Sequence, residues 1–180
     1  RCYGKDGRRM TVKQLHRLIG HGNNRVKDDF YPTPTNATLA LLEREKFDGN
    51  IWEPACGDGA ISKLLKQQGY EVYSTDLVDR GYGDAHFDFL NSHEKYDNIV
   101  TNPPFNIGTK FALHSLHCVN KKVALFQKLT FLEGKERRNK LYSLQMLKKV
   151  YIFSERQGFG DYKGGMLAKS EEHTSELQSH

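Results

Sequence analysis

Cysteine is scarce in this sequence, and its spacing excludes two common uses. The 180 residues include three cysteines, Cys2, Cys56 and Cys118, which form no C-x-x-C pair and no metal-ligand spacing with the eight histidines. The sequence therefore supports neither a disulfide framework nor a zinc site. We expect reduced thiols and no bound metal.

Long apolar runs are missing as well. No apolar stretch approaches the roughly 18 residues that a membrane-spanning helix requires, and the first residues lack the charged, apolar and small-residue order of a signal peptide. A hydrophobic content of 37% with 27% charged residues is typical of a globular protein. We expect a cytoplasmic protein with no membrane segment, although a start at Arg1 without Met leaves open a missing beginning.

The last eleven residues, SEEHTSELQSH, differ in composition from the rest. They are polar, follow no period of 2 or 3.6, and interrupt GGMLAK, which reads as the opening of a strand. The string resembles the translation of a common sequencing-library adapter, so we interpret 170–180 as a non-native tail. Without its three glutamates the formal net charge rises from +5 to +8, which suits a polyanionic partner.

Short apolar segments alternate with helix-like segments along most of the chain. Helices are expected over 33–46, 60–68, 109–119 and 135–147, and strands over 51–53, 70–77, 85–90, 96–102, 122–129 and 148–154. Thr35 or Asn36 is the expected N-cap of the first helix, and Gly69 the C-terminal cap of the second. Residues 1–27 form an N-terminal extension with one short helix, and 28–169 form a single domain.

This alternation predicts an α/β fold with a mostly parallel sheet and helices on both faces. In such folds ligands gather at the carboxyl ends of the strands. Four segments are expected there: the turn that begins at Glu53, the acid Asp76, the segment 87–89, and the tetrapeptide 102–105.

The turn after the first strand reads Glu53-Pro54-Ala55-Cys56-Gly57-Asp58-Gly59. Gly57 and Gly59 let the backbone approach a ligand closely. A dinucleotide site would require a third glycine, whereas Glu53 and Asp58 supply negative charge. A cationic ligand without phosphate, such as S-adenosylmethionine, fits better, and a purely structural corner is the alternative.

Two further strand ends carry acids. Asp76 is placed to accept hydrogen bonds from both ribose hydroxyls of a nucleoside, with a helix N-cap as the alternative. Asp88 could accept from an adenine amino group while the ring of Phe89 covers the base, and Asp84 competes for that role.

The tetrapeptide Asn102-Pro103-Pro104-Phe105 ends the fourth predicted strand. Two prolines hold the backbone extended, so the Asn102 amide oxygen and the Pro103 carbonyl can face one point and accept from an exocyclic amine. Phe105 can stack on the base that carries the amine, and catalysis would be orientation and electrostatics. A structural double-proline turn is the alternative.

Together these motifs resemble the γ-type amino methyltransferases, S-adenosylmethionine-dependent enzymes that include DNA N6-adenine methyltransferases. YPTP is similar to the N-terminal cofactor motif of the family, EPACGDGA to its cofactor loop, STDL and FDFL to its ribose and adenine contacts, and NPPF to its catalytic tetrapeptide. The resemblance implies a Rossmann-like class I methyltransferase fold over about residues 28–168, with S-adenosylmethionine as cofactor. It adds Tyr31, Thr33, Pro34 and Ala55 to the cofactor-binding residues.

The resemblance also implies a substrate. DDFYPTP, the small size and LTFLEGKERR are similar to compact phage-type DNA adenine methyltransferases, so we favour adenine N6 in flipped-out DNA. Backbone phosphates would then meet the basic segment 135–149, with Lys135, Arg137, Arg138 and Lys140 as candidate contacts. A solvated helix face also explains that segment.

Other functions remain open at this point. The same tetrapeptide occurs in methyltransferases of protein glutamine and of RNA bases, and a non-catalytic nucleic-acid-binding relative is a further alternative. A cytosine C5 mechanism is excluded, because no cysteine follows a proline at the catalytic strand end.

Two features depart from the pattern of the family. The sheet of the family ends in an antiparallel seventh strand. GGMLAK stands where this strand should begin and runs directly into the foreign tail, so we expect the last strand to be missing. No target-recognition domain is visible, so sequence specificity would come from loops, a missing part or a partner subunit.

Overall fold

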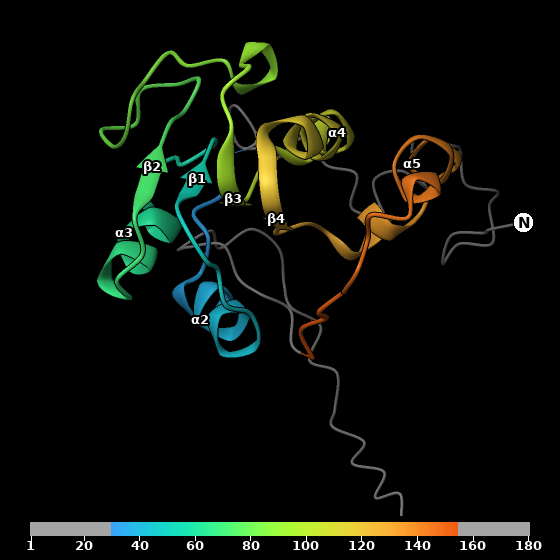
Figure 1. The fold of residues 1–180 in the computed structure, drawn as a ribbon, viewed down its shortest axis with the longest axis horizontal. Coiled ribbons are helices and arrows are strands. Elements are labelled where there is room, and N and C mark those ends of the chain that lie inside the picture. Colours follow the sequence, from blue (N-terminus) through green and yellow to red (C-terminus); the bar gives the residue numbers. More distant parts are fainter. Residues whose placement is uncertain (1–29, 155–180) are drawn as a thin grey trace, which may run out of the picture. The chain divides into compact units, whose positions relative to one another are not determined.

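The computed structural model describes residues 30–154, which contain a four-stranded parallel sheet. The strands are β1 (Ile51–Glu53), β2 (Val72–Ser74), β3 (Tyr96–Thr101) and β4 (Val119–Leu125). Figure 1 shows them side by side in the order β2-β1-β3-β4. The N-terminal extension with its predicted helix and the tail 170–180 lie outside the described residues.

Helices cover both faces of this sheet. Ile51 of β1 packs in one core cluster with α2 (Thr35–Arg44) and α3 (Ala60–Gln67). Trp52, the next residue, packs in a second cluster with α4 (Gly108–Cys118) and the 3-10 helix η2 (Phe89–Asn91). Because successive strand residues point to opposite faces, β1 divides the core between two helical layers, as the predicted α/β fold requires.

The ends of α3 and α2 differ in how well their sequence signals predicted them. At Gly69, with φ of +87°, the N–H donates to the carbonyl of Lys66 at 3.0 Å, and the N–H of Tyr70 donates to that of Leu65 at 3.1 Å. This confirms the predicted left-handed cap. The predicted cap of α2 is wrong: the extended Pro34 precedes the helix, so Thr35 and Asn36 already lie in its first turn, without a side-chain cap.

Residues 85–90 do not form the predicted third strand. Among the residues described, pairing beyond β2 consists of one isolated bridge, between Thr75 and Asp84, and a backbone bond from the N–H of Phe87 to the carbonyl of Asp76 at 3.0 Å. The Asp88 side chain instead caps η2, accepting from the N–H of Leu90 at 3.0 Å and from the Asn91 amide at 2.8 Å. Aspartate offers the backbone such local bonds in place of a ladder, so the alternating apolar pattern was misleading here.

The C-terminal part of the described chain is also less regular than predicted. The basic helix ends early, since α5 covers Lys135–Lys140 and only a short 3-10 helix, η5 (Tyr142–Leu144), follows. Residues 148–154 form no strand. β4 lies at the edge of the described sheet, and this segment is instead bound through Lys149 and Tyr151 to the Glu45 carboxylate, at 2.6 and 2.7 Å.

Candidate active site

The carboxyl ends of β1 and β2 meet through the carboxylate of Asp76. One of its oxygens accepts from the N–H of Gly57 at 2.8 Å, and the other accepts from the N–H of Val78 at 2.9 Å. Each carboxylate oxygen can accept a further bond. Asp76 therefore fixes the glycine-rich turn and still offers acceptors at what we call the carboxyl edge of the sheet.

The glycines of this turn have left-handed backbones and close neighbours. Gly57 has φ of +57° and Gly59 has φ of +82°. A Cβ would lie 2.3 Å from the ring of Phe30 at the first position and 2.5 Å from the ring of Tyr82 at the second. Two aromatic rings thus lie against the turn, one with Arg80 4.2 Å from its centroid. Neither ring was predicted, although Phe30 directly precedes the YPTP motif.

Glu53, at the end of β1, is directed into the fold. It is 1% exposed and accepts from both the N–H (2.8 Å) and the hydroxyl of Ser62, whose oxygen lies 2.6 Å from that of Ser74. Burial raises the pKa of Glu53 to about 8, against the opposing hydrogen bonds from Ser62. The side chain is therefore mostly neutral at pH 7, which leaves Asp58 and Asp76 as the charges near the turn; the predicted cofactor contact of Glu53 stays a prediction.

Asn102 lies directly after β3, and the N-terminal motif holds its amide. Nδ2 donates to the carbonyl of Tyr31 at 3.2 Å and to the hydroxyl of Thr33 at 3.0 Å. Oδ1 is buried and has no hydrogen-bond partner among the residues described. The structure therefore brings the predicted cofactor motif to the catalytic tetrapeptide and leaves one acceptor of Asn102 open.

The rest of the tetrapeptide forms a rigid exit from β3. Pro103 is fully buried, and Pro104 precedes the 3-10 helix η3 (Phe105–Ile107). The half-buried ring of Phe105 stacks on that of Tyr31, with centroids 5.9 Å apart and planes inclined by 27°. An aromatic face thus stands three residues after the open acceptor of Asn102.

The two predicted adenine contacts, Asp88 and Phe89, lie in different surroundings. Phe89 is 2% exposed and packs against Trp52 and Phe111 in the core, so its ring cannot cover a base in this arrangement, which corrects the prediction. Asp88 is exposed and lines an open cleft of about 590 Å³ together with His86, Phe87, Asn91, Ser92, His93 and Glu94. Phe87 is the aromatic residue that faces this cleft.

The predicted phosphate contacts also differ from one another. Lys135, Arg138 and Lys140 are exposed on α5, and Lys140 pairs with Glu136 at 3.1 Å. Arg137 is half-buried, donates to the carbonyl of Thr130 at 3.1 Å and lies 5.2 Å from the ring centroid of Phe131. Arg137 therefore holds its own loop rather than facing outward.

Two kinds of feature are absent from the residues that the structure describes. No helix in 30–154 is long and apolar enough to cross a membrane. Within the same range no group of His, Cys, Asp and Glu side chains could hold a metal ion.

Comparison with known proteins supports the fold. No family model matches this chain, and no curated protein sequence matches it. A candidate RNA methyltransferase of Pyrococcus horikoshii is 18% identical, with a TM-score of 0.50 over 76% of this chain and 79% of that one. The magnesium protoporphyrin IX methyltransferase of Synechocystis PCC 6803, solved with bound SAM, is 17% identical, with a TM-score of 0.42 over 68% and 66% of the two chains. The chain has the Rossmann-like fold of class I methyltransferases, as predicted.

Proposed function

We propose that this protein transfers a methyl group from S-adenosylmethionine to the exocyclic N6 amine of adenine in DNA. The observation that carries the proposal is the open Oδ1 of Asn102, buried without a partner among the described residues while Tyr31 and Thr33 hold Nδ2. A buried acceptor left without a donor costs free energy. An N–H group of a ligand would satisfy it, and an exocyclic amine supplies such a group.

The chemistry of an aromatic amine explains why an acceptor is useful there. The nitrogen lone pair is delocalised into the ring, so the amine is a poor nucleophile. When Asn102 Oδ1 accepts a hydrogen bond from one N–H group of the amine, electron density stays on nitrogen and the amine is oriented toward the methyl donor. The residues then act by position and electrostatics, with no covalent intermediate.

The residues around the glycine-rich turn fit the proposed cofactor. Asp58 and Asp76 place negative charge beside Gly57, which suits a sulfonium and an ammonium better than a phosphate. The Asp76 oxygens can accept from ribose hydroxyls while they hold the turn. When bound, S-adenosylmethionine would supply the methyl group as an electrophile.

Phe105 favours a base over an amino-acid side chain as the target. A base stacked on an aromatic ring gains about 1–3 kcal/mol, whereas a glutamine side chain has no ring to stack. The net charge of +5 and the exposed Lys135 and Arg138 of α5 favour a nucleic acid. A DNA duplex would present its adenine only after the base is flipped out.

One labelling experiment tests the proposal. The protein is incubated with methyl-labelled S-adenosylmethionine and unmethylated duplex DNA, the DNA is digested to nucleosides, and the labelled species is identified by mass. We expect N6-methyldeoxyadenosine, and no label with an Asn102→Ala control. Label in RNA or in protein glutamine, with none in DNA, would contradict the proposed substrate.

A further inference from the structure

Lys128 follows β4 at the carboxyl edge, beside the tetrapeptide. The N–H of Phe126 donates to the carbonyl of Thr101 at 3.0 Å, which extends the β3–β4 pairing beyond β4. The chain therefore leaves β4 alongside Asn102-Pro103-Pro104, and the Lys128 ammonium lies 4.4 Å from the ring centroid of Phe105.

The Lys128 side chain is available for another partner. It is exposed, and no carboxylate in the described part of the chain pairs with it. Its position is set at the backbone, where its carbonyl accepts from the N–H of Phe131 at 2.8 Å. A flexible four-carbon stem lets the ammonium move while this backbone stays fixed.

Lys128 and a target base would compete for the same ring. A base that stacks on the face of Phe105 covered by Lys128 has to displace the ammonium. The contact of a solvent-exposed ammonium with an aromatic ring is weak, and a base stacked on such a ring makes a stronger contact. The exchange is therefore favourable, and it releases a positive charge next to the nucleotide that has just entered.

We propose that Lys128 is a positioning residue that leaves Phe105 when the target base arrives and then pairs with a phosphate beside the flipped nucleotide of DNA. This inference rests on the proposed function, because it requires a base on Phe105. A lysine that only shields the ring from water is the structural alternative, and it makes no phosphate contact.

The test compares Lys128→Ala, Lys128→Arg and Lys95→Ala in the full chain. Lys95 is a matched control, since it is exposed and directly precedes β3, at the opposite edge of the sheet. The kinetic constants kcat and KM for unmethylated duplex DNA are measured between about 50 and 200 mM salt. Binding of a fluorescein-labelled duplex, followed by anisotropy over the same range, gives a readout independent of turnover.

Loss of one phosphate contact should lower the salt slope of log affinity by about 0.9 and raise KM about fivefold near 0.15 M salt. We expect this for Lys128→Ala, with kcat within twofold of the wild type, recovery in Lys128→Arg and no change in Lys95→Ala. An unchanged slope and KM in Lys128→Ala, or an equal change in Lys95→Ala, would overturn the inference alone. A wild-type protein that methylates no DNA would overturn the proposed function and this inference with it.

Discussion

Asn98 and Asn102 belong to the same stretch of chain, and their side chains are bonded in the same way. Each donates through Nδ2 to two oxygens of another segment, and each has a buried Oδ1 without a partner among the described residues. Asn98 lies inside β3, whereas Asn102 lies just beyond its end. Comparing the two residues therefore separates the effect of a buried acceptor without a partner from the effect of its position in the sheet.

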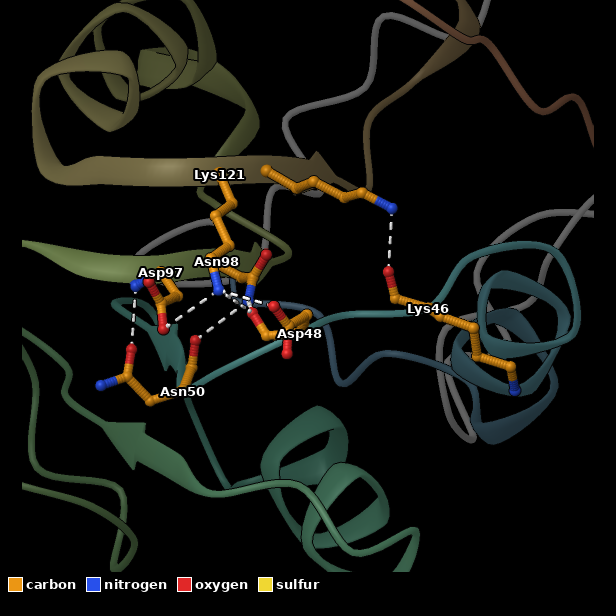
Figure 2. Close-up of polar contacts among 7 residues, drawn as sticks. Lys46, Asp48, Asn50, Asp97, Asn98 and Lys121 are labelled. Atoms are coloured by element: carbon orange, nitrogen blue, oxygen red, sulfur yellow. Dashed lines mark hydrogen bonds and ion pairs between the residues drawn. The ribbon is translucent and has the colours of Figure 1, made fainter.

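Asn98 serves the architecture of the opposite edge. Figure 2 shows its amide between Asp48 and Asn50, whose carbonyls accept at 2.9 and 3.1 Å. The N–H of Asp97 donates to Asn50 Oδ1 at 2.8 Å, and Lys121 reaches Asp48 Oδ2 at 2.8 Å in the same network. These bonds hold the turn that leads into β1, and Asn98 itself is 0% exposed.

Asn102 is bonded equally well but at the edge where β1, β2 and β3 end. Its neighbours are the YPTP motif and Phe105, and Asp76 and the glycine-rich turn lie at the same edge. A buried acceptor without a partner is therefore not sufficient to mark a site. It indicates one when it lies where parallel strands of an α/β sheet place their ligands.

The largest expected effect is on methyl transfer, when Asn102 at the carboxyl edge is substituted. Asn102→Ala should lower methyl transfer about 10²–10³-fold, the usual cost of removing one group that stabilises the transition state. Cofactor affinity, measured by calorimetry, should stay within a few-fold because the amide acts on the target amine. An equal loss of cofactor affinity would contradict that role.

Glu53 lies at the same edge as Asn102, but its side chain is bonded inside the fold. We therefore expect its substitution to change the pH dependence of stability. Its pKa rises from 4.5 to about 8 on folding, so its contribution to stability is present below pH 4.5 and is lost as the pH rises toward 8. Glu53→Gln should remove this loss, on the order of 3 kcal/mol, in urea unfolding curves between pH 5 and 8. A pH dependence identical to that of the wild type would show that Glu53 is ionised in the folded protein.

The Asp76 variant separates cofactor binding from the methyl-transfer step. Asp76→Ala should weaken cofactor affinity about 10- to 100-fold, since it removes charge-assisted bonds to the ligand and to the N–H of Gly57. Asp79→Ala is the control, because that carboxylate accepts from Gly81 in the adjacent exposed loop. If both variants bind the cofactor equally well, the ribose contact is wrong.

The smallest effect is expected for Asn98→Ala, and it should fall on stability. Removing the amide breaks two hydrogen bonds, although the carbonyl of Asp48 keeps Lys121 as a donor and that of Asn50 keeps the N–H of residue 98. The loss of two bonds should cost about 1–3 kcal/mol in the free energy of unfolding. Asn120→Ala, an exposed position in β4, should change it by less than about 0.5 kcal/mol. Urea unfolding measures both, and equal stabilities would remove the architectural role of Asn98.

Features that depend on neighbouring residues were predictable from the sequence. The left-handed cap at Gly69, the four strands of the sheet and the glycine-rich turn each have a local cause. Residues 85–90 show the limit of such reasoning, because their alternation suits a strand and only the capping bonds of Asp88 decide otherwise. The same holds for Phe89, whose burial depends on Trp52 and α4.

The arrangement of Asn102 could not be predicted, although the residue itself was. Its partners Tyr31 and Thr33 precede it by about 70 positions, and only the fold brings them together. Lys128 on Phe105 is a contact of the same kind. Sequence patterns identified the chemical groups at this edge, and tertiary structure determined which of their atoms remain open.

The most direct test of this account is the single-turnover rate of methyl transfer to DNA by Asn102→Ala and by Asn98→Ala, at a temperature where both are folded. We predict a rate at least about 100-fold below the wild type for Asn102→Ala, and a rate within about threefold of it for Asn98→Ala. Equal losses in the two variants, or the larger loss in Asn98→Ala, would contradict the claim that the open oxygen of Asn102 meets the target amine.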